Sequence, residues 1–377
     1  MPNSVKPKIL FLYGNDPNPS LIERAHLLEE TGRFESHIAF WHRQNSDISI
    51  PFSTDLPDSR THQINLPDPR GNAITRGLLS LRFARKLRSA INRNKINVVY
   101  AVNPDMLGLA NIALFGNRRV GITYDFQDQK GDFLGFIRKY IFKTILRKTS
   151  FVLIRSEGFR NQIVRHDLVD SHTPVKYMAE APLGWQTPRP SPENDHLKVG
   201  YYGNIRGRTQ LKNLISAVGE LRESGKNIKL DVAGGGPDSS WFQNETAHLD
   251  FVNFSGAFDY FKNYKSTFEA ADIIHAVYPL DWINYYTHEA RRFHEAIAAG
   301  IPLIVSSGTY MSDRVETLNV GWTVRSESKD DLIDALSEAH DNRDLLTQKT
   351  VDDRTRAHHQ LEHYEQLLIE SIEAALK

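Results

Sequence analysis

The chain has 377 residues, of which 40% are hydrophobic and 24% are charged, and its formal net charge is zero. This length predicts two domains, and the composition is that of a soluble globular protein. No run approaches the roughly 18 apolar residues of a membrane-spanning helix, and residues 1–8 lack the apolar region of a secretory signal, so we expect neither feature. The absence of cysteine excludes disulfides, thiolate metal ligands and cysteine nucleophiles, and suits a cytoplasmic protein.

The zero net charge conceals two halves of opposite sign. Residues 1–190 contain 27 Lys and Arg against 17 Asp and Glu, whereas residues 191–377 contain 19 against 29. Such a split predicts two domains with different neighbours. The opposite charges either help the two halves to dock or give the first half an affinity for anionic lipid or an anionic lipid-linked acceptor.

Short apolar runs alternate with helical segments in the first half of the chain. We expect a helix from about residue 21 to 31 and strands at residues 8–13, 36–41, 98–101, 120–125 and 151–155. Strands that alternate with helices predict a parallel, doubly wound sheet. A polar stretch with three prolines, residues 186–195, then interrupts the pattern and indicates a linker or crossover.

After this stretch the alternation starts again. We expect a helix at 209–224, two closing helices near 329–345 and 350–376, and strands at 198–202, 228–233, 251–255, 271–276, 303–306 and 321–324. The predicted class is therefore α/β. The expected domains are residues 1–190 and 191–345, with a C-terminal helix in 346–377.

The most informative segment runs from Arg292 to Pro302. A helix of small residues ends at Gly300, and Pro302 leads into an apolar strand, as any helix-to-strand turn requires. Glu295 is less ordinary, because its neighbours are apolar and a carboxylate in such surroundings needs a partner. The edge of a parallel sheet is where α/β proteins bind ligands, so Glu295 is a candidate binding residue.

This segment resembles the F-x-E-A-x-A-x-G-x-P-x-I motif of glycosyltransferases with the GT-B fold, in particular the large retaining family 4. The resemblance implies two Rossmann-like, doubly wound domains that face a cleft. It implies a nucleotide-sugar donor bound by the second domain and an acceptor bound by the first, and a C-terminal helix, within residues 346–377, that returns to the first domain. Glu295 would then hold the ribose of the donor.

A glycine-containing loop follows the first strand of the second domain. It begins with Gly203 and Asn204, continues through Arg206 and Arg208, and resembles the family's donor loop, G-x-x-x-x-K-G-x-x-x-L-I-x-A. Glycines let backbone N–H groups approach a diphosphate, and arginines offer planar donor pairs to its oxygens. The resemblance implies that both arginines contact the diphosphate. A loop with ordinary surface arginines is the alternative.

A second glycine loop contains Gly234 and Gly235. It resembles the family's G-x-G-P turn, whose backbone borders the nucleotide base. A tight turn that needs positive φ angles would explain the glycines equally well.

The helix that carries Glu295 is expected to begin near Asn284 or Thr287, since either residue suits the N-cap position. Its free N–H groups would face a donor phosphate or sugar. Helical spacing places three residues on the same side as Glu295, namely His288, Arg291 and Arg292.

Thr287 stands where the best-known family members carry a second acid. Arg292 instead matches a subgroup with the pattern K-x-x-E, and Glu289 is a possible substitute for the missing acid.

In the first domain, Asp125 and Asp128 end a strand in a segment that resembles the family's Y-D-x-H-D. Gln127 replaces the histidine, and an amide cannot take a proton, so this site would form hydrogen bonds without acting as a base. Capping of the strand is the alternative role for the two acids. The loop that begins with Gly14 and Asn15 is expected on the same side and would contact the acceptor.

Two segments supply the excess positive charge, residues 76–88 and 133–148. Both mix apolar and cationic residues at helical spacing. Their apolar stripes either pack onto the sheet or, where exposed, lie on anionic lipid. We expect no nucleic-acid partner, because the pI is about 7.3 and no recognised module is present. The fifteen histidines form no metal-binding motif, so we expect neither a metal nor a cofactor.

The resemblance implies a metal-independent hexosyltransferase that moves a sugar, with retention, to a saccharide or polyprenyl-linked acceptor in surface polysaccharide biosynthesis at the inner face of the membrane. Arg206, Arg208 and Glu295 would carry the donor chemistry, with cationic groups stabilising the leaving diphosphate. Two alternatives stay open: a nucleotide-sugar epimerase of the same fold, and a catalytically silent partner subunit, which Thr287 and Gln127 favour.

Overall fold

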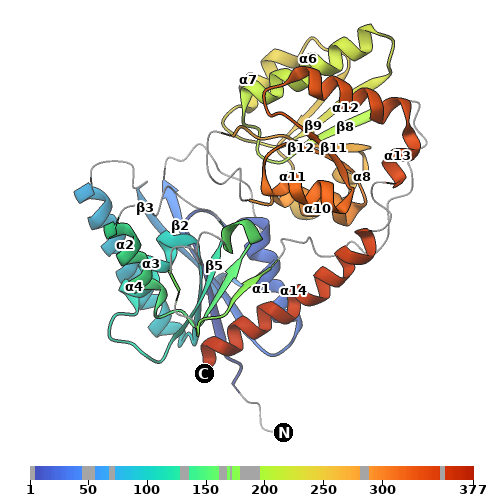
Figure 1. Ribbon diagram of the computed structural model, residues 1–377. Helices are drawn as coiled ribbons and strands as arrows, with labels where there is room; N and C mark the ends of the chain where they lie inside the picture. The colour runs from blue at the N-terminus through green and yellow to red at the C-terminus, as the bar shows by residue number, and fades with distance from the viewer. Residues whose placement is uncertain are drawn as a thin grey trace. The chain divides into compact units, whose positions relative to one another are not determined.

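The computed structural model describes residues 5–44, 56–67, 73–127, 136–160, 168–169, 172–178, 196–280, 288–348 and 353–377. The chain divides into two compact units (Figure 1). Unit 1 consists of Met1–Ala179 together with His363–Lys377, and unit 2 consists of Glu180–Glu362.

Unit 1 is built on a seven-stranded parallel sheet in the order β3-β2-β1-β4-β5-β6-β7. Its strands are β1 (Lys8–Tyr13), β2 (Glu35–Gln44), β3 (Thr61–Pro67), β4 (Val98–Val102), β5 (Gly121–Phe126), β6 (Phe151–Ile154) and β7 (Val175–Tyr177). The strand order reverses between β1 and β4, so a ligand-binding crevice is expected outside the carboxyl ends of these two strands.

Helices pack on both faces of this sheet. They are α1 (Pro19–Glu30), α2 (Ala73–Asn94), α3 (Asn103–Ala113) and α4 (Phe136–Leu146), with a short 3₁₀ turn at Asp58–Arg60. Helices α2, α3 and α4 pack against one face of the sheet, and together they form a single hydrophobic core. Helix α1 and the end of the C-terminal helix lie at the other face (Figure 1).

Unit 2 has a six-stranded parallel sheet in the order β10-β9-β8-β11-β12-β13. Its strands are β8 (Leu197–Tyr202), β9 (Ile228–Ala233), β10 (Val252–Gly256), β11 (Ile273–Ala276), β12 (Leu303–Ser306) and β13 (Gly321–Val324). Its helices are α6 (Arg208–Glu223), α7 (Ser239–Thr246), α8 (Tyr260–Glu269), α10 (Arg291–Ala299), α11 (Tyr310–Leu318), α12 (Lys329–Asp341) and α13 (Arg343–Gln348). Helices α6 and α12 pack on one face, and α8, α10 and α11 on the other.

These two parallel, doubly wound sheets confirm the predicted α/β class. Two strands were not predicted. β3 is an edge strand in which only Ile64 and Leu66 are buried, and β7 has three residues, so neither forms a strong apolar run. None of the helices in the described residues combines the length and hydropathy that crossing a bilayer requires.

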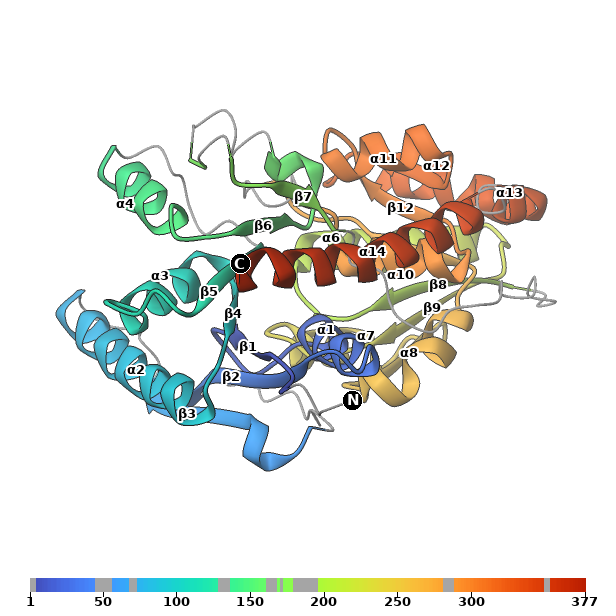
Figure 2. The ribbon, with the colours of Figure 1, turned by 90° about the horizontal axis from the view of Figure 1, so that it is seen from below.

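The C-terminal helix α14 (Asp353–Leu376) ends on unit 1 (Figure 2). Leu368 and Ile372 are fully buried there. The Oγ1 of Thr123 on β5 donates a hydrogen bond of 2.8 Å to the Ser371 carbonyl, and the Nε of Arg24 on α1 donates one of 2.8 Å to the Tyr364 hydroxyl. The last residues of the chain are therefore part of the first folding unit.

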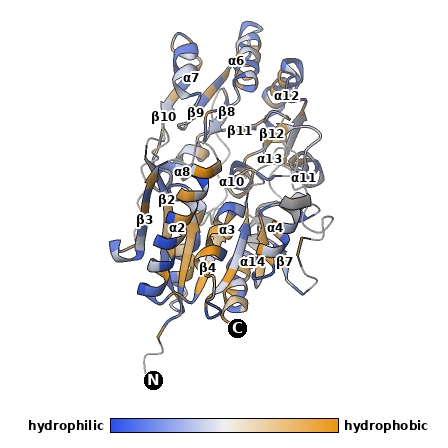
Figure 3. Ribbon diagram, turned by 90° about the vertical axis from the view of Figure 1, so that its left-hand side faces the viewer, coloured by the Kyte–Doolittle hydropathy of each residue, from blue (hydrophilic) through white to orange (hydrophobic). Residues whose placement is uncertain are grey.

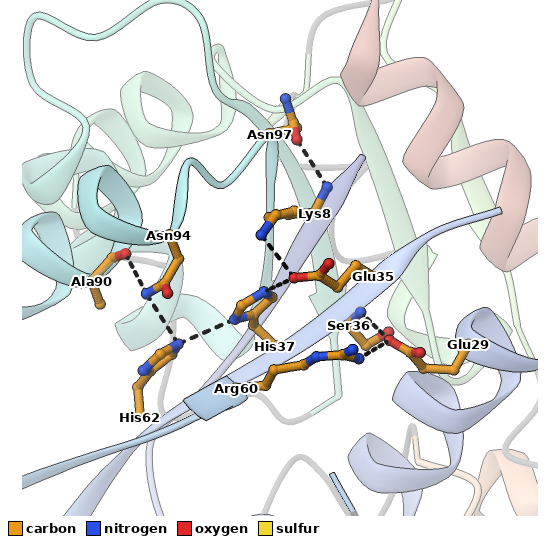
Figure 4. Close-up of polar contacts among 10 residues, drawn as sticks. All are labelled: Lys8, Glu29, Glu35, Ser36, His37, Arg60, His62, Ala90, Asn94 and Asn97. Carbon is orange, nitrogen blue, oxygen red and sulfur yellow. Dashed lines mark hydrogen bonds and ion pairs between the residues drawn. The ribbon is translucent and has the colours of Figure 1, made fainter. Parts of the chain in front are cut away.

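A histidine pair lies beside the amino ends of β1 and β2 (Figure 4). The rings of His37 and His62 stack with their centroids 5.5 Å apart, and the Nε2 of His37 is 2.8 Å from a carboxylate oxygen of Glu35, which also pairs with Lys8. Burial lowers the pKa of His62 to about 4, and the positive charges of His37 and Arg93 act in the same direction. Burial also lowers the pKa of His37, so both rings are neutral at pH 7.

This pair predicts an acid-sensitive unit 1. The ordinary pKa of a histidine is 6.5, so between pH 6.5 and about 4 the unfolded chain binds a proton that folded His62 does not. The contribution of His62 to stability is complete above pH 6.5 and is lost as the pH falls toward 4. We expect His62→Asn to reduce the pH dependence of the unfolding free energy over this range, as measured by urea denaturation. His172→Asn, at an exposed histidine, serves as the control. An unchanged slope in His62→Asn would contradict the assignment.

Candidate active site

The strand order of unit 2 reverses between β8 and β11. In open parallel sheets this reversal marks the crevice where ligands bind, outside the carboxyl ends of the strands. The loop at residues 203–207, which follows β8, and the start of α10 both lie at this edge. The loop after β9 lies beside the loop after β8. The predicted donor residues are therefore close together in one region.

The loops after β8 and β9 interlock through their backbones. The N–H of Gly203 donates to the Ala233 carbonyl at 2.9 Å, and the N–H of Ile205 donates to the Gly235 carbonyl at 2.8 Å. A Cβ added to Gly234 would lie 1.7 Å from the Gly203 carbonyl oxygen, and Gly234 also has a φ of +149°. Glycine is therefore required here both by the positive φ and by the close approach of the neighbouring loop.

The side chain of Asn204 takes part in the same contact. A Cβ added to Gly236 would lie 2.2 Å from the Asn204 Oδ1 and 2.6 Å from the Ile205 carbonyl oxygen. The structure thus brings Gly203, Asn204, Gly234 and Gly235 together, as the resemblance implies for the loops that border a nucleotide diphosphate and base.

Arg292 is buried beneath the loop after β8. Its Cζ lies 4.2 Å from the ring centroid of Tyr201 and 5.4 Å from that of Tyr278, and its Nη1 donates to the His275 carbonyl at 3.1 Å. Its Nη2 would be 3.3 Å from a Cβ on Gly203. Burial opposes the charge, but Tyr278 and Tyr201 shift the net pKa of Arg292 upward. A fixed positive charge therefore lies next to the first glycine of the loop.

His275 lies beside this arginine and is itself fully buried. Burial, followed by the charge of Arg292, lowers its pKa to about 3. Its imidazole is therefore neutral at physiological pH and adds no second positive charge to the site.

Glu295 is only 4% exposed and has the partner that its apolar neighbours on α10 demand. Its Oε1 accepts a hydrogen bond of 2.8 Å from the Nε of Arg291 and another from the Tyr260 hydroxyl. The Nη2 of Arg291 donates to the same hydroxyl at 2.6 Å, and its Cζ lies 4.6 Å from the Tyr260 ring centroid. An arginine and a tyrosine thus fix one oxygen of this carboxylate.

The expectation of a longer helix with one functional face is wrong. α10 begins at Arg291, with Ala290 as N-cap and no side-chain cap, so His288 precedes the helix. The expected caps, Asn284 and Thr287, lie outside the described residues. Arg291 turns to Glu295, whereas Arg292 turns to the loop after β8. The observed N-cap, Ala290, lies three residues after Thr287 and six after Asn284, and this later start changes which side chains share a face.

Glu289, the possible substitute for the missing acid, faces the interior of unit 2. It is fully buried, its Oε1 accepts from the Nε of Arg314 on α11 at 3.1 Å, and its Oε2 lies 3.6 Å from the Nε2 of His294. This ion pair ties the segment before α10 to α11.

Arg206 and Arg208 are both exposed at the loop. The Nε of Arg208 donates to the Asp238 Oδ1 at 2.7 Å, and its guanidinium lies 5.5 Å from the Trp241 ring centroid. The Tyr201 hydroxyl donates to the carbonyls of Asn204 and Arg206 at 3.0 and 3.3 Å. The tyrosine that contacts Arg292 therefore also fixes the path of the arginine loop.

A cavity of about 700 Å³ opens at the same edge of sheet 2, where α6 and α12 begin. Its lining residues are Thr209, Gln210, Pro279, Leu280, Ser307, Arg325, Ser326, Glu327 and Ser328. None of the predicted donor residues lines it. The chemistry therefore points to the glycine loops and α10 in preference to this cavity.

Asp125, predicted on the acceptor side, belongs to a buried network in unit 1. Its Oδ2 accepts from the Arg24 guanidinium, from the Tyr100 hydroxyl at 3.0 Å and from the Gln127 Nε2 at 2.7 Å. Gln127 thus forms a hydrogen bond, as expected, and that bond goes to Asp125. The carboxylate is 1% exposed, so a contact with acceptor stays a prediction. Asp128 lies outside the described residues.

Gly14 and Asn15 follow β1 at the point where the strand order of sheet 1 reverses. A Cβ on Gly14 would lie 3.2 Å from the Oδ2 of Asp105 at the start of α3, and Asn15 is exposed. In the described residues no three side chains of His, Cys, Asp or Glu are grouped so that they could hold a metal ion.

The model of the family "Glycosyl transferases group 1" matches residues 186–356, the part of the chain that carries this site. The chain carries a group 1 glycosyl transferase domain. The match confirms the prediction of a glycosyltransferase. No curated protein sequence matches the chain significantly.

Solved structures of the GT-B fold resemble this glycosyltransferase over almost its whole length. HepE of Anabaena, in complex with UDP and glucose, has a TM-score of 0.70 at 13% identity over 97% of this chain and 99% of its own. Sucrose-phosphate synthase of Thermosynechococcus elongatus has a TM-score of 0.68 at 15% identity, over 97% of this chain and 98% of its own. The lipopolysaccharide outer core galactosyltransferase WaaB has a TM-score of 0.60 at 16% identity, over 94% of this chain and 99% of its own. These likenesses confirm the predicted GT-B fold.

Several residues of the candidate site were missed from the sequence. Tyr201 precedes the first glycine loop, Tyr278 follows β11, and Tyr260 begins α8. Each contacts an arginine of α10 from an element that is remote in the chain. The spacing of residues along the chain therefore does not predict these contacts. The positions of Tyr201 and Tyr278 near strand ends do place both at the carboxyl edge of sheet 2, where the candidate site lies.

The interlocked loops make a prediction about Gly234. We expect Gly234→Ala to lower the unfolding free energy of this glycosyltransferase by more than about 2 kcal/mol, because the added methyl group collides with the Gly203 carbonyl. The matched control is Gly219→Ala inside α6, where the nearest atom is an ordinary 3.8 Å away and the change should stabilise by about 0.5–1 kcal/mol. Denaturation curves of both variants check the opposite signs, and equal stability of Gly234→Ala and the wild type would contradict the argument.

Proposed function

We propose that this glycosyltransferase takes its sugar from a nucleotide-diphosphate sugar held by unit 2. The observation that carries the proposal is the convergence of the two interlocked glycine loops with Arg292 and Glu295 at the reversal of the strand order. Closely packed glycine backbone, a fixed cation and a buried carboxylate are the groups that a diphosphate and a ribose require. The complex of HepE with UDP and glucose supports the same donor class.

Within this site we assign the ribose to Glu295. Both described hydrogen bonds of its carboxylate go to Oε1, so Oε2 is the atom assigned to a ribose hydroxyl. Arg291 and Tyr260 would hold the carboxylate in place. Its low exposure makes such a contact strong and directional, because a buried charged acceptor has few competing water molecules.

The diphosphate is assigned to the loop after β8. Arg208 donates to Asp238 through Nε, and its two Nη groups would serve the phosphate oxygens, together with Arg206 and the backbone of Gly203 and Asn204. Gly234 and Gly235 would border the base. Thr287, His288 and Arg292 would lie toward the phosphate and sugar.

The proposed chemistry is that of retaining family 4. As the bond between the sugar and the diphosphate breaks, negative charge develops on the leaving phosphate. Arg206, Arg208 and the fixed cation of Arg292 would stabilise this charge without needing to reorganise, which is electrostatic catalysis. The proposal requires neither a metal ion nor a covalent nucleophile.

We propose a saccharide or polyprenyl-linked acceptor for unit 1, made in surface polysaccharide assembly at the inner face of the membrane. The excess positive charge of residues 1–190 supports an anionic acceptor. The name of WaaB, a lipopolysaccharide outer core galactosyltransferase, supports this class of product. Gly14, Asn15, Asp125 and Asp128 are the residues proposed on the acceptor side.

Glu295→Ala and Arg206→Ala test the donor site. Each removes one charged hydrogen-bonding group, so we expect UDP to bind roughly 10- to 100-fold more weakly in titration calorimetry. Glu223→Ala and Lys229→Ala are the matched controls, because both side chains are exposed at the opposite, amino edge of sheet 2. Unchanged affinity in both site variants would remove the donor assignment.

A companion measurement separates transfer from its alternatives. Thermal stabilisation by UDP, GDP and ADP sugars would first identify the donor. The products formed from that donor with and without a saccharide acceptor then decide the reaction. A changed sugar in the absence of acceptor would indicate an epimerase, and binding without any reaction would indicate a silent subunit.

A further inference from the structure

Exposed hydrophobic side chains are concentrated on three helices of unit 1. Nine large hydrophobic residues are exposed in the described part of the chain, and none of them is in the described part of unit 2. Seven are on neighbouring helices that cover one face of sheet 1: Ile74, Leu78 and Leu81 on the first half of α2, Ile112 and Phe115 at the end of α3, and Tyr140 and Ile141 on α4. We call these seven residues the apolar face.

Helix α2 has two apolar stripes. One stripe is buried on the sheet and consists of Leu79, Phe83, Leu87 and Ile91. The other lies on the opposite side of the helix, where Ile74, Leu78 and Leu81 follow the i, i+4, i+7 spacing and are 75%, 56% and 50% exposed. A helix that only covers a sheet needs a single apolar stripe, so packing within unit 1 leaves the second stripe unexplained.

Helix α3 packs against both α2 and α4, so the three helices form one layer (Figure 3). The Nη1 of Arg88 on α2 donates to the Phe115 carbonyl at 2.9 Å, which fixes the turn that exposes Phe115 to 75%. The Nδ2 of Asn111 on α3 donates to the Ile145 carbonyl on α4 at 3.4 Å. Several exposed apolar side chains on one layer of packed helices make this layer a candidate interaction site.

The charged residues of α2 and α4 are all cationic. Helix α2 contains six Lys and Arg residues, and residues 73–104 contain no Asp or Glu. Residues 133–156, which include α4, also lack acidic residues. On the solvent side of α2, Arg82, Arg85 and Lys86 are exposed and have no ion-pair partner among the described residues. The surface therefore offers hydrophobic side chains together with uncompensated positive charge.

We propose that the apolar face docks on an anionic lipid bilayer. The hydrophobic side chains would enter the boundary between headgroups and acyl chains, and the flanking cations would lie on lipid phosphates. A second copy of the chain fits this surface less well, because a symmetric pair would bring the same unpaired cations of α2 toward each other. The inference stands on unit 1 alone and does not depend on the donor site.

The docking direction follows from the topology. α2 follows β3 and α4 follows β5, so both helices begin at the carboxyl edge of sheet 1, where the loop of Gly14 and Asn15 also lies. Attachment through Ile74 and Leu78 on the first turns of α2 would hold this edge close to the lipid surface. If the proposed function is correct, a polyprenyl-linked acceptor then reaches the edge without leaving the bilayer.

Sedimentation with lipid vesicles tests the inference. We expect the full chain to bind vesicles of phosphatidylglycerol and phosphatidylcholine at low salt, and to bind pure phosphatidylcholine vesicles much more weakly. The triple variant Arg82→Gln, Arg85→Gln, Lys86→Gln should bind the anionic vesicles about 100-fold more weakly. The triple variant Ile74→Gln, Leu78→Gln, Leu81→Gln should lose at least about 10-fold even at low salt.

The control is a triple variant that removes three positive charges from unit 2. It changes the exposed residues Lys229, Lys262 and Lys265 to Gln. It should bind vesicles like the wild type. Thermal unfolding verifies that all variants are folded, and UDP binding should be unchanged in each of them. Absence of wild-type binding to anionic vesicles, or equal binding by wild type and both α2 variants, would overturn the proposal. A wild-type dimer that the Ile74, Leu78, Leu81 variant abolishes, without vesicle binding, would assign the surface to self-association instead.

Discussion

The candidate site depends on the close approach of two loops at the carboxyl edge of sheet 2. The Gly203 carbonyl occupies the space that any side chain at Gly234 would need. This contact fixes the loop after β8 over Arg292, whose guanidinium lies between two tyrosine rings. The guanidinium of Arg292 keeps its position because the two rings enclose it. The backbone of the loop after β8 keeps its position because Gly203 and Gly234 pack directly against each other. A preorganised site of this kind is suited to a charge that develops during a reaction.

Both units bury a carboxylate near the carboxyl edge of the sheet, and in both an arginine and a tyrosine donate to one of its oxygens. Glu295 has Arg291 and Tyr260, whereas Asp125 has Arg24 and Tyr100. Removing such a partner would leave an uncompensated buried charge and be strongly destabilising, so both partners are needed to keep each acid in its position. The difference lies in Gln127, a third donor to the same oxygen of Asp125. Because of this third hydrogen bond, the Asp125 Oδ2 is more fully occupied by neighbours within unit 1 than the Glu295 Oε1 is within unit 2.

Much of the fold was predictable, because parallel strands buried on both faces are continuous apolar runs that end at recognisable loops. The two missed strands show the limit. β3 lies at the edge of sheet 1 and needs few buried side chains, and β7 is only three residues long. The start of α10 was misplaced for a similar reason. A polar residue suited to capping predicts a helix start only if the backbone turns there, and the observed N-cap is Ala290, which has no capping side chain.

By itself, the sequence determined the two α/β units, the glycine loops at strand ends and the acid on the helix before Gly300, because strands, turns and helix ends depend on neighbouring residues. Only the tertiary structure decided that Arg291 turns to Glu295 while Arg292 turns to the loop after β8, since their partners, Tyr260, Tyr201 and Tyr278, come from other elements. It also decided that the second stripe of α2 faces outward. Periodicity shows that a helix has apolar residues on a given side, but only packing determines whether that side meets the sheet or remains exposed.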